Sequence, residues 1–140
     1  MPITNWSIIR ENMSFTEKQK LEVWSRAKAV DGFNPDLYRK DACDAWIIWD
    51  KYSDTDSLYG WEIDHVVPES LLVKKGFDRT QIDDNANLRA LNWMNNRSKA
   101  DDYPHYTAAV VSQGVKNVVT EKHLSVNEVK REKLYNLFGI

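Results

Sequence analysis

The stretch from Trp61 to Ser70, WEIDHVVPES, is the part of the sequence from which the fold can be inferred. Tryptophan, isoleucine and two valines are typical of a strand, and Pro68 follows them, so the stretch predicts a strand over 61–67. The polar pair Asp64–His65 lies near the end of that strand. A lone histidine is more often a hydrogen-bonded structural residue than a general base, so this pair by itself identifies no active site.

Two segments further along the chain give the pair a context. A connection over 69–86, with one helical turn expected at about 71–75, leads to NANLRAL (85–91), which predicts a short strand over 88–91. NWMNNRSK (92–99) then opens a polar, helix-compatible region over 92–101, and Pro104 follows it. The predicted order is strand, connection, strand, helix.

These three segments together resemble the HNH endonuclease family and its ββα-metal (His-Me finger) motif over about 59–103. The resemblance implies an α+β fold with a ββα-metal core, and a metal-dependent endonuclease that hydrolyses phosphodiester bonds in DNA. It implies that His65 is the general base and that Asn87 orients it through the loop backbone. It also implies that Asp64 and Asn96 hold the metal. Candidates for contacts with nucleic acid are Lys99, Arg97, Lys74, Lys75 and Arg89.

The chemistry of these residue types agrees with the division of roles. Histidine titrates near neutral pH, so His65 can take a proton from water. One carboxylate oxygen and one amide oxygen suit a hard cation, Mg²⁺ first and Mn²⁺ as an alternative. Side chains of neighbouring strand residues point to opposite faces. Asp64 and His65 therefore share one site only if the strand ends or twists there, or if the substrate reaches both faces.

Many HNH proteins carry a structural zinc held by two Cys-x-x-Cys pairs, and the corresponding positions here are Cys43 and Trp46, then Asn92 and Asn95. Three of the four sulfurs are absent, and tryptophan cannot bind zinc. We therefore expect no structural zinc, with Trp46 and Trp93 filling its space. The expected role of Cys43 is that of a small buried hydrophobic residue.

The remaining chain predicts a scaffold around this core. A capping-box spacing at 14–17 predicts a helix over about 15–29, and 37–52 predicts a strand or irregular hairpin. A hairpin is expected from 107–111 and 115–120. A second capping box at 125–128 predicts a terminal helix, with one packed face formed by Val129, Leu134, Leu137 and Phe138.

Length and composition predict one domain over 1–140, because 140 residues suit a single core and no flexible linker is present. The net charge of −2 gives no overall basic field, and the single cysteine excludes an intrachain disulfide. No apolar run approaches the roughly 20 residues of a membrane span. We expect a cytoplasmic protein with DNA, double-stranded by preference, as its partner.

Two alternatives stay open. The chain can be a nucleic-acid-binding module that keeps an HNH frame without cleavage, or a fold whose partner is a protein. The small size and the absence of a separate recognition domain predict low sequence specificity, or a partner that supplies it.

Overall fold

The computed structural model describes residues 15–140, and this part of the chain is an α+β fold, which confirms the expected class. Its six strands pair as three separate antiparallel hairpins. They are β1 (Tyr38–Lys40) with β2 (Trp46–Ile48), β3 (Trp61–His65) with β4 (Leu88–Asn92), and β5 (His105–Gln113) with β6 (Lys116–Ser125).

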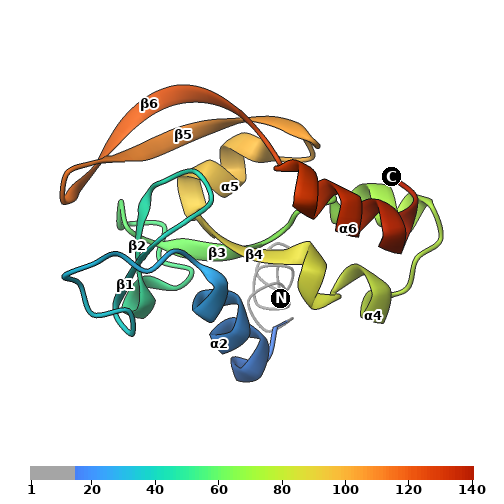
Figure 1. Cartoon of the computed structure of the whole chain (residues 1–140), viewed down its shortest axis with the longest axis horizontal. Helices are drawn as coiled ribbons and strands as arrows, with labels where there is room; N and C mark the ends of the chain where they lie inside the picture. Colours follow the sequence, from blue (N-terminus) through green and yellow to red (C-terminus); the bar gives the residue numbers. More distant parts are fainter. Residues whose placement is uncertain (1–14) are drawn as a thin grey trace, which may run out of the picture.

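Helices surround these hairpins. The α-helices of the described part are α2 (Glu17–Arg26), α3 (Glu69–Lys74), α4 (Arg79–Ile82), α5 (Trp93–Lys99) and α6 (Glu128–Phe138), with 3-10 turns η1 (Trp49–Lys51) and η2 (Asn85–Asn87). Figure 1 shows the β3–β4 hairpin in the middle, with α2 on one side of it and α5 on the other. The long β5–β6 ribbon lies beyond α5.

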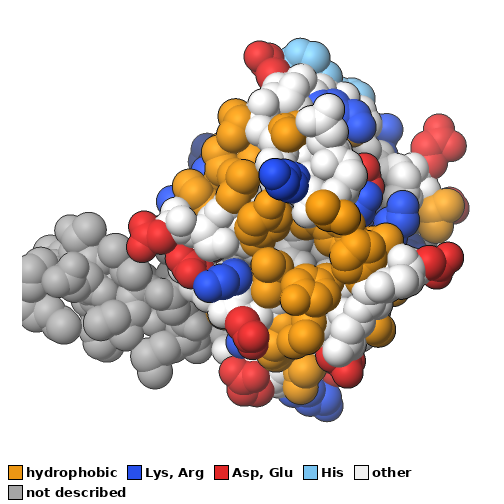
Figure 2. All heavy atoms as spheres, turned by 90° about the vertical axis from the view of Figure 1, so that its left-hand side faces the viewer, with side chains coloured by type: hydrophobic (Ala, Val, Ile, Leu, Met, Phe, Trp, Pro, Cys, Tyr) orange, Lys and Arg blue, Asp and Glu red, His pale blue; other side chains and the backbone are white. Residues whose placement is uncertain are grey.

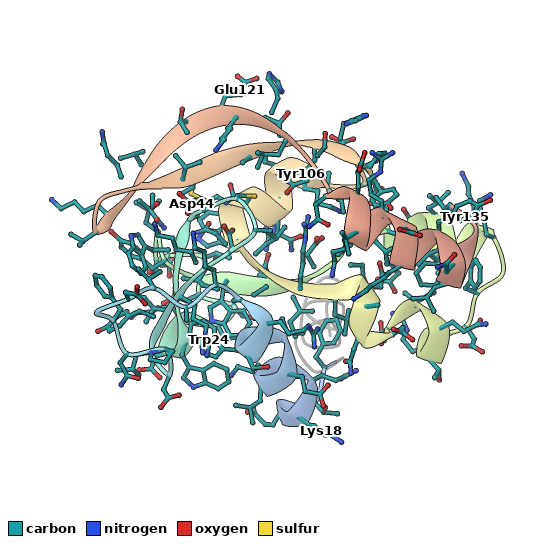
Figure 3. The ribbon with its side chains drawn as sticks, viewed as in Figure 1. Lys18, Trp24, Asp44, Tyr106, Glu121 and Tyr135 are labelled. Carbon is teal, nitrogen blue, oxygen red and sulfur yellow. The ribbon has the colours of Figure 1, made fainter. Side chains whose placement is uncertain are left out.

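The β3–β4 hairpin has two differently used faces. Its register is regular from Trp61 opposite Asn92 to His65 opposite Leu88. On the α2 face, Trp61 and Ile63 join a buried cluster with Trp24 of α2, where the rings of Trp24 and Trp61 lie 5.1 Å apart. Figure 3 shows Trp24 beside α2, below β3. The opposite face, toward α5, carries polar side chains.

The segment that leads from β3 to β4 is more helical than expected. β3 ends at His65, two residues earlier than the predicted 67, and α3, α4 and η2 follow in place of a single helical turn. The short helix α4 has a capping box, since the Asp78 carboxylate accepts from Gln81 N and the Gln81 side chain accepts from Asp78 N. This Asp-x-x-Gln spacing at 78–81 is a helix signal that the sequence analysis missed.

The N-terminal helix α2 is shorter than predicted. It begins after Thr16, whose side chain forms a capping box with Gln19, and it ends at Arg26 because Ala27 has an extended backbone. Ser14, the expected cap, lies outside the described residues. The stretch over 37–52 forms an irregular pair of three-residue strands, as predicted.

The C-terminal part forms the expected hairpin and helix with two corrections. The ribbon is longer than predicted, with an irregularity between Ala108 and Val110, and Asn127 caps α6 through Lys130 N. Only part of the predicted apolar face of α6 is buried. Leu134 and Phe138 join the core, while Val129 is 69% exposed and Leu137 is 42% exposed.

The surface around β1 and β2 remains apolar. Phe33, Leu37 and Tyr38 are each more than a third exposed, and the Phe33 ring lies 4.7 Å from that of Trp46. Figure 2 views the end of the molecule where β1 and β2 lie, and apolar side chains gather there among scattered charges of both signs.

Candidate active site at the end of the β3–β4 hairpin

Asp64 and His65 leave β3 on opposite faces. The strand keeps its alternation to its end, because Asp64 stands opposite Arg89 and His65 opposite Leu88 without a bulge. The carboxylate of Asp64 contacts residues of β4 and α5, whereas the imidazole of His65 contacts Asp83 and the ring of Phe15. The break in alternation that would place both side chains in one site does not occur.

Two cations enclose the Asp64 carboxylate. Arg89 Nε donates to Asp64 Oδ2 at 3.0 Å, and Lys99 Nζ lies 3.4 Å from Oδ1. The Lys99 side chain is fully buried and also donates to the His65 carbonyl at 3.2 Å. Burial lowers the pKa of Lys99, and the charge of Asp64 opposes that shift. Asp64 is thus neutralised inside the protein by two ion pairs.

His65 is held by a carboxylate that the sequence analysis did not assign to the site. His65 Nε2 lies 2.7 Å from Asp83 Oδ1, and the two side chains are 13% and 10% exposed. Asp83 directly follows α4. The capping box at 78–81, had it been recognised, would have predicted a short helix that ends near Asp83.

The side chain of Asn87 forms hydrogen bonds with the backbone that follows His65. Its Oδ1 accepts from Val67 N at 2.7 Å, and its Nδ2 donates to the carbonyls of Val67 and Ile82 at 3.2 and 3.1 Å. The Asn87 carbonyl also accepts from Val66 N at 2.9 Å. One fully buried amide therefore joins the end of β3, the end of α4 and the start of β4.

Asn96 lies on α5 and binds Glu62, not Asp64. Its Nδ2 donates to Glu62 Oε1 at 3.0 Å, and the neighbouring Arg97 donates to Glu62 Oε2 at 3.1 Å. Glu62 and Asp64 are two residues apart on β3, so both side chains point to the α5 face. The residue that completes this polar face is Glu62, which the sequence analysis did not single out.

The donor types on the α5 face fit a hard divalent cation, but their present partners compete with it. Carboxylate and amide oxygens are the ligands that Mg²⁺ accepts, usually with several waters. Both Asp64 oxygens are engaged by Arg89 and Lys99, so a cation reaches Asp64 only by displacing one of them. Within residues 15–140, no three His, Cys, Asp or Glu side chains form a group that could hold a metal.

The five basic candidates for nucleic-acid contact divide into two groups. Lys74 and Lys75 are exposed at the end of α3, and the Arg97 side chain is 62% exposed on α5. Lys99 and Arg89 lie inside, with side chains 0% and 12% exposed. These two do not present their charge to a partner in this arrangement, contrary to expectation, because Asp64 holds them.

Three of the four positions that correspond to the zinc cysteines, Cys43, Asn92 and Asn95, take part in a hydrogen-bonded network around Asp41. Asp41 Oδ1 accepts from the backbone N–H of Cys43 and Ala45, and Oδ2 accepts from Asn92 N at 2.8 Å and Asn95 Nδ2 at 3.1 Å. Burial raises the pKa of Asp41, and these hydrogen bonds oppose that shift. A carboxylate therefore joins the two segments.

The two tryptophans expected to fill the zinc position donate hydrogen bonds from their indole N–H groups to backbone carbonyls. Trp46 Nε1 donates to the Gly114 carbonyl at 2.8 Å, and Trp93 Nε1 donates to the Ser57 carbonyl at 2.7 Å. Cys43 is buried, and burial together with Asp41 raises the pKa of its thiol to about 12. That thiol stays protonated at neutral pH, in accord with the expected packing role. The absence of a structural zinc stays a prediction.

Comparisons with known proteins identify no family for this chain. Neither the family models, nor the curated proteins, nor the solved structures include a match to this chain. No helix in the described part of the chain has the length and apolar character needed to cross a membrane.

Proposed function

We propose that this chain is a metal-dependent endonuclease of the HNH type that hydrolyses phosphodiester bonds in DNA. The observation that carries the proposal is the arrangement of β3, β4 and α5 as an antiparallel hairpin followed by a helix that packs on it. Asp64 and His65 on β3, Asn87 directly before β4 and Asn96 on α5 follow the order of the family motif. The finer ββα-metal assignment of the fold is part of this proposal.

In the proposed mechanism each residue has a separate task, and the substrate reaches both faces of the hairpin where β3 ends, because Asp64 and His65 point to opposite faces. His65 takes the proton from the attacking water, and Asn87 keeps the backbone after His65 in place. Asp64 and Asn96 would hold Mg²⁺ or Mn²⁺, which would supply positive charge for the phosphate in the transition state. The exposed cations Lys74, Lys75 and Arg97 bind the DNA backbone.

A plasmid-nicking assay tests the proposal. Supercoiled plasmid is incubated with the protein and Mg²⁺ or Mn²⁺, and His65→Ala is compared with His123→Ala, because His123 is an exposed histidine on β6. We expect cleavage by the wild type, a loss of about 100-fold or more in His65→Ala, and no loss in His123→Ala. Equal nicking by the wild type and His65→Ala contradicts the proposed base. Thermal unfolding of each variant separates loss of chemistry from loss of fold.

A second candidate function is supported by the ion pairs of Asp64. Because Arg89 and Lys99 already satisfy the carboxylate, and His65 points to the other face, the same frame can bind nucleic acid without cutting it. In that case the wild type binds duplex DNA with strong salt dependence and produces no nicks with any divalent metal.

A further inference from the structure

We propose that Asp83 is the positioning residue of His65: it holds the imidazole through Nε2 and leaves Nδ1 as the atom that accepts the proton. This inference rests on the proposed nuclease function and names a member of the site that the family motif does not include. Asp83 acts through His65 and not on the substrate.

The contact between the two side chains determines which ring nitrogen is free. An ionised carboxylate only accepts hydrogen bonds, so the 2.7 Å contact with Asp83 Oδ1 requires a proton on His65 Nε2. In a neutral imidazole the lone pair then lies on Nδ1. Among residues 15–140, no hydrogen bond to Nδ1 of His65 is present, and the proposal assigns the acceptance of the proton from water to this atom.

Asp83 is itself held in place. Arg79 Nη1 donates to Asp83 Oδ1 at 3.3 Å, and the other end of the same guanidinium pairs with Glu69. The chain Glu69–Arg79–Asp83–His65 therefore runs from α3 through α4 to the end of β3. Because the Arg79 side chain is 54% exposed, its contribution is to orient Asp83 and not to add much stability.

One buried amide sets the distance between the partners. Asn87 binds the backbone of Val67, two residues after His65, and the carbonyl of Ile82, the residue before Asp83. Both partners of the hydrogen bond are thus anchored to the same side chain. A base whose partner is fixed in this way keeps its orientation between turnovers, as in other sites where a third group orients the base.

A proton NMR experiment on the full chain tests the pairing without requiring activity. We expect a slowly exchanging downfield N–H signal from His65 Nε2 that is absent in His65→Gln. Asp83→Ala should remove this signal. Asp84→Ala is the control, because Asp84 is the neighbouring carboxylate and accepts from the backbone N–H of Ala86 at 2.9 Å, but does not bind His65.

Steady-state cleavage kinetics test the positioning role. In Asp83→Ala we expect kcat to fall by about 10-fold or more, with KM for duplex DNA unchanged and with Asp84→Ala near the wild type. The double variant with His65→Ala should be no slower than His65→Ala alone, because Asp83 acts only through His65. A purely structural role would instead lower activity in parallel with the folded fraction and would add to the loss in His65→Ala.

The outcomes separate this inference from the proposed function. Full kcat in Asp83→Ala, or a wild type without the downfield signal, overturns the positioning role while leaving the nuclease proposal in place. A wild type that shows the signal but cleaves no nucleic acid with any divalent metal overturns the proposed function, and with it the catalytic role of the pair.

Discussion

The ammonium of Lys99 lies 3.4 Å from the carboxylate of Asp64, and neither side chain is more than 5% exposed. Arg89 provides a second cation to the same carboxylate, at 3.0 Å. The three charges do not contribute equally to the stability of the fold. Removing Lys99 leaves a balanced pair of Asp64 with Arg89, whereas removing the charge of Asp64 leaves two buried cations without a counter-ion.

The first prediction is that Asp64→Asn destabilises the protein more than Lys99→Met does. Loss of the shared anion should lower the free energy of unfolding by about 3–5 kcal/mol, the range for a broken buried ion pair, and Lys99→Met should lower it by less. Urea unfolding measures both, with exposed Asp101→Asn as the control. Equal losses would show that Lys99, and not the shared carboxylate, dominates the network.

A second prediction concerns Asp41. Asp41→Asn replaces one carboxylate oxygen with an N–H donor, which then faces donors from the 43–45 segment or from Asn92 and Asn95. Each unsatisfied buried group costs about 1–3 kcal/mol, so we expect a loss of about 3 kcal/mol or more in urea unfolding.

Asp44→Asn provides the matched control for Asp41. The Asp44 side chain is 51% exposed and pairs with Lys40 at 3.5 Å, so its substitution should change stability only slightly. If Asp41→Asn is as stable as Asp44→Asn, then Asp41 does not join the two segments as inferred.

The local pattern of the sequence predicted the elements of the site better than their contacts. Residue types and the flanking proline predicted β3, and the polar run after Leu91 predicted α5, because strand and helix formation depend on neighbours within a few residues. The residues that touch the expected site come from farther away. Asp83 meets His65 across 18 positions, and Glu62 meets Asn96 across 34.

The burial of charged residues was the least predictable feature. A lysine two positions after exposed Arg97 is normally solvated, and nothing local marks Lys99 as a fully buried residue. Its burial depends on Asp64, 35 positions earlier, which supplies the counter-charge. For the same reason no local pattern indicated that Asp41 is buried. Two of the four donors to its carboxylate lie on Asn92 and Asn95, more than 50 positions later.

A third prediction is that Lys130 makes the free energy of unfolding depend on pH in the alkaline range. Burial and the charges of Arg89, Arg26 and Lys133 lower the pKa of Lys130 to about 8, with Asp64 opposing them. A lysine in the unfolded chain titrates near 10.5. Between these values the unfolded chain binds more protons, so this group raises the free energy of unfolding as pH increases.

Lys130→Met tests that prediction. The variant should be more stable than the wild type at about pH 7, and this difference should shrink as pH approaches about 10. Urea unfolding at several pH values measures the change, and exposed Lys122→Met is the control. A constant difference between wild type and Lys130→Met across this range would contradict the depressed pKa.

The last prediction separates the exposed cations from the buried ones in DNA binding. Each phosphate contact contributes about −0.9 to the slope of log K against log salt concentration for duplex DNA. Lys74→Ala with Lys75→Ala should therefore make this slope less steep by up to about 1.8, measured by fluorescence anisotropy with a duplex oligonucleotide. Lys99→Met should leave the slope unchanged, because Asp64 holds the Lys99 ammonium inside the protein. A flatter slope in Lys99→Met would instead mean that DNA draws Lys99 away from Asp64, which would free the carboxylate for a divalent cation when the substrate binds.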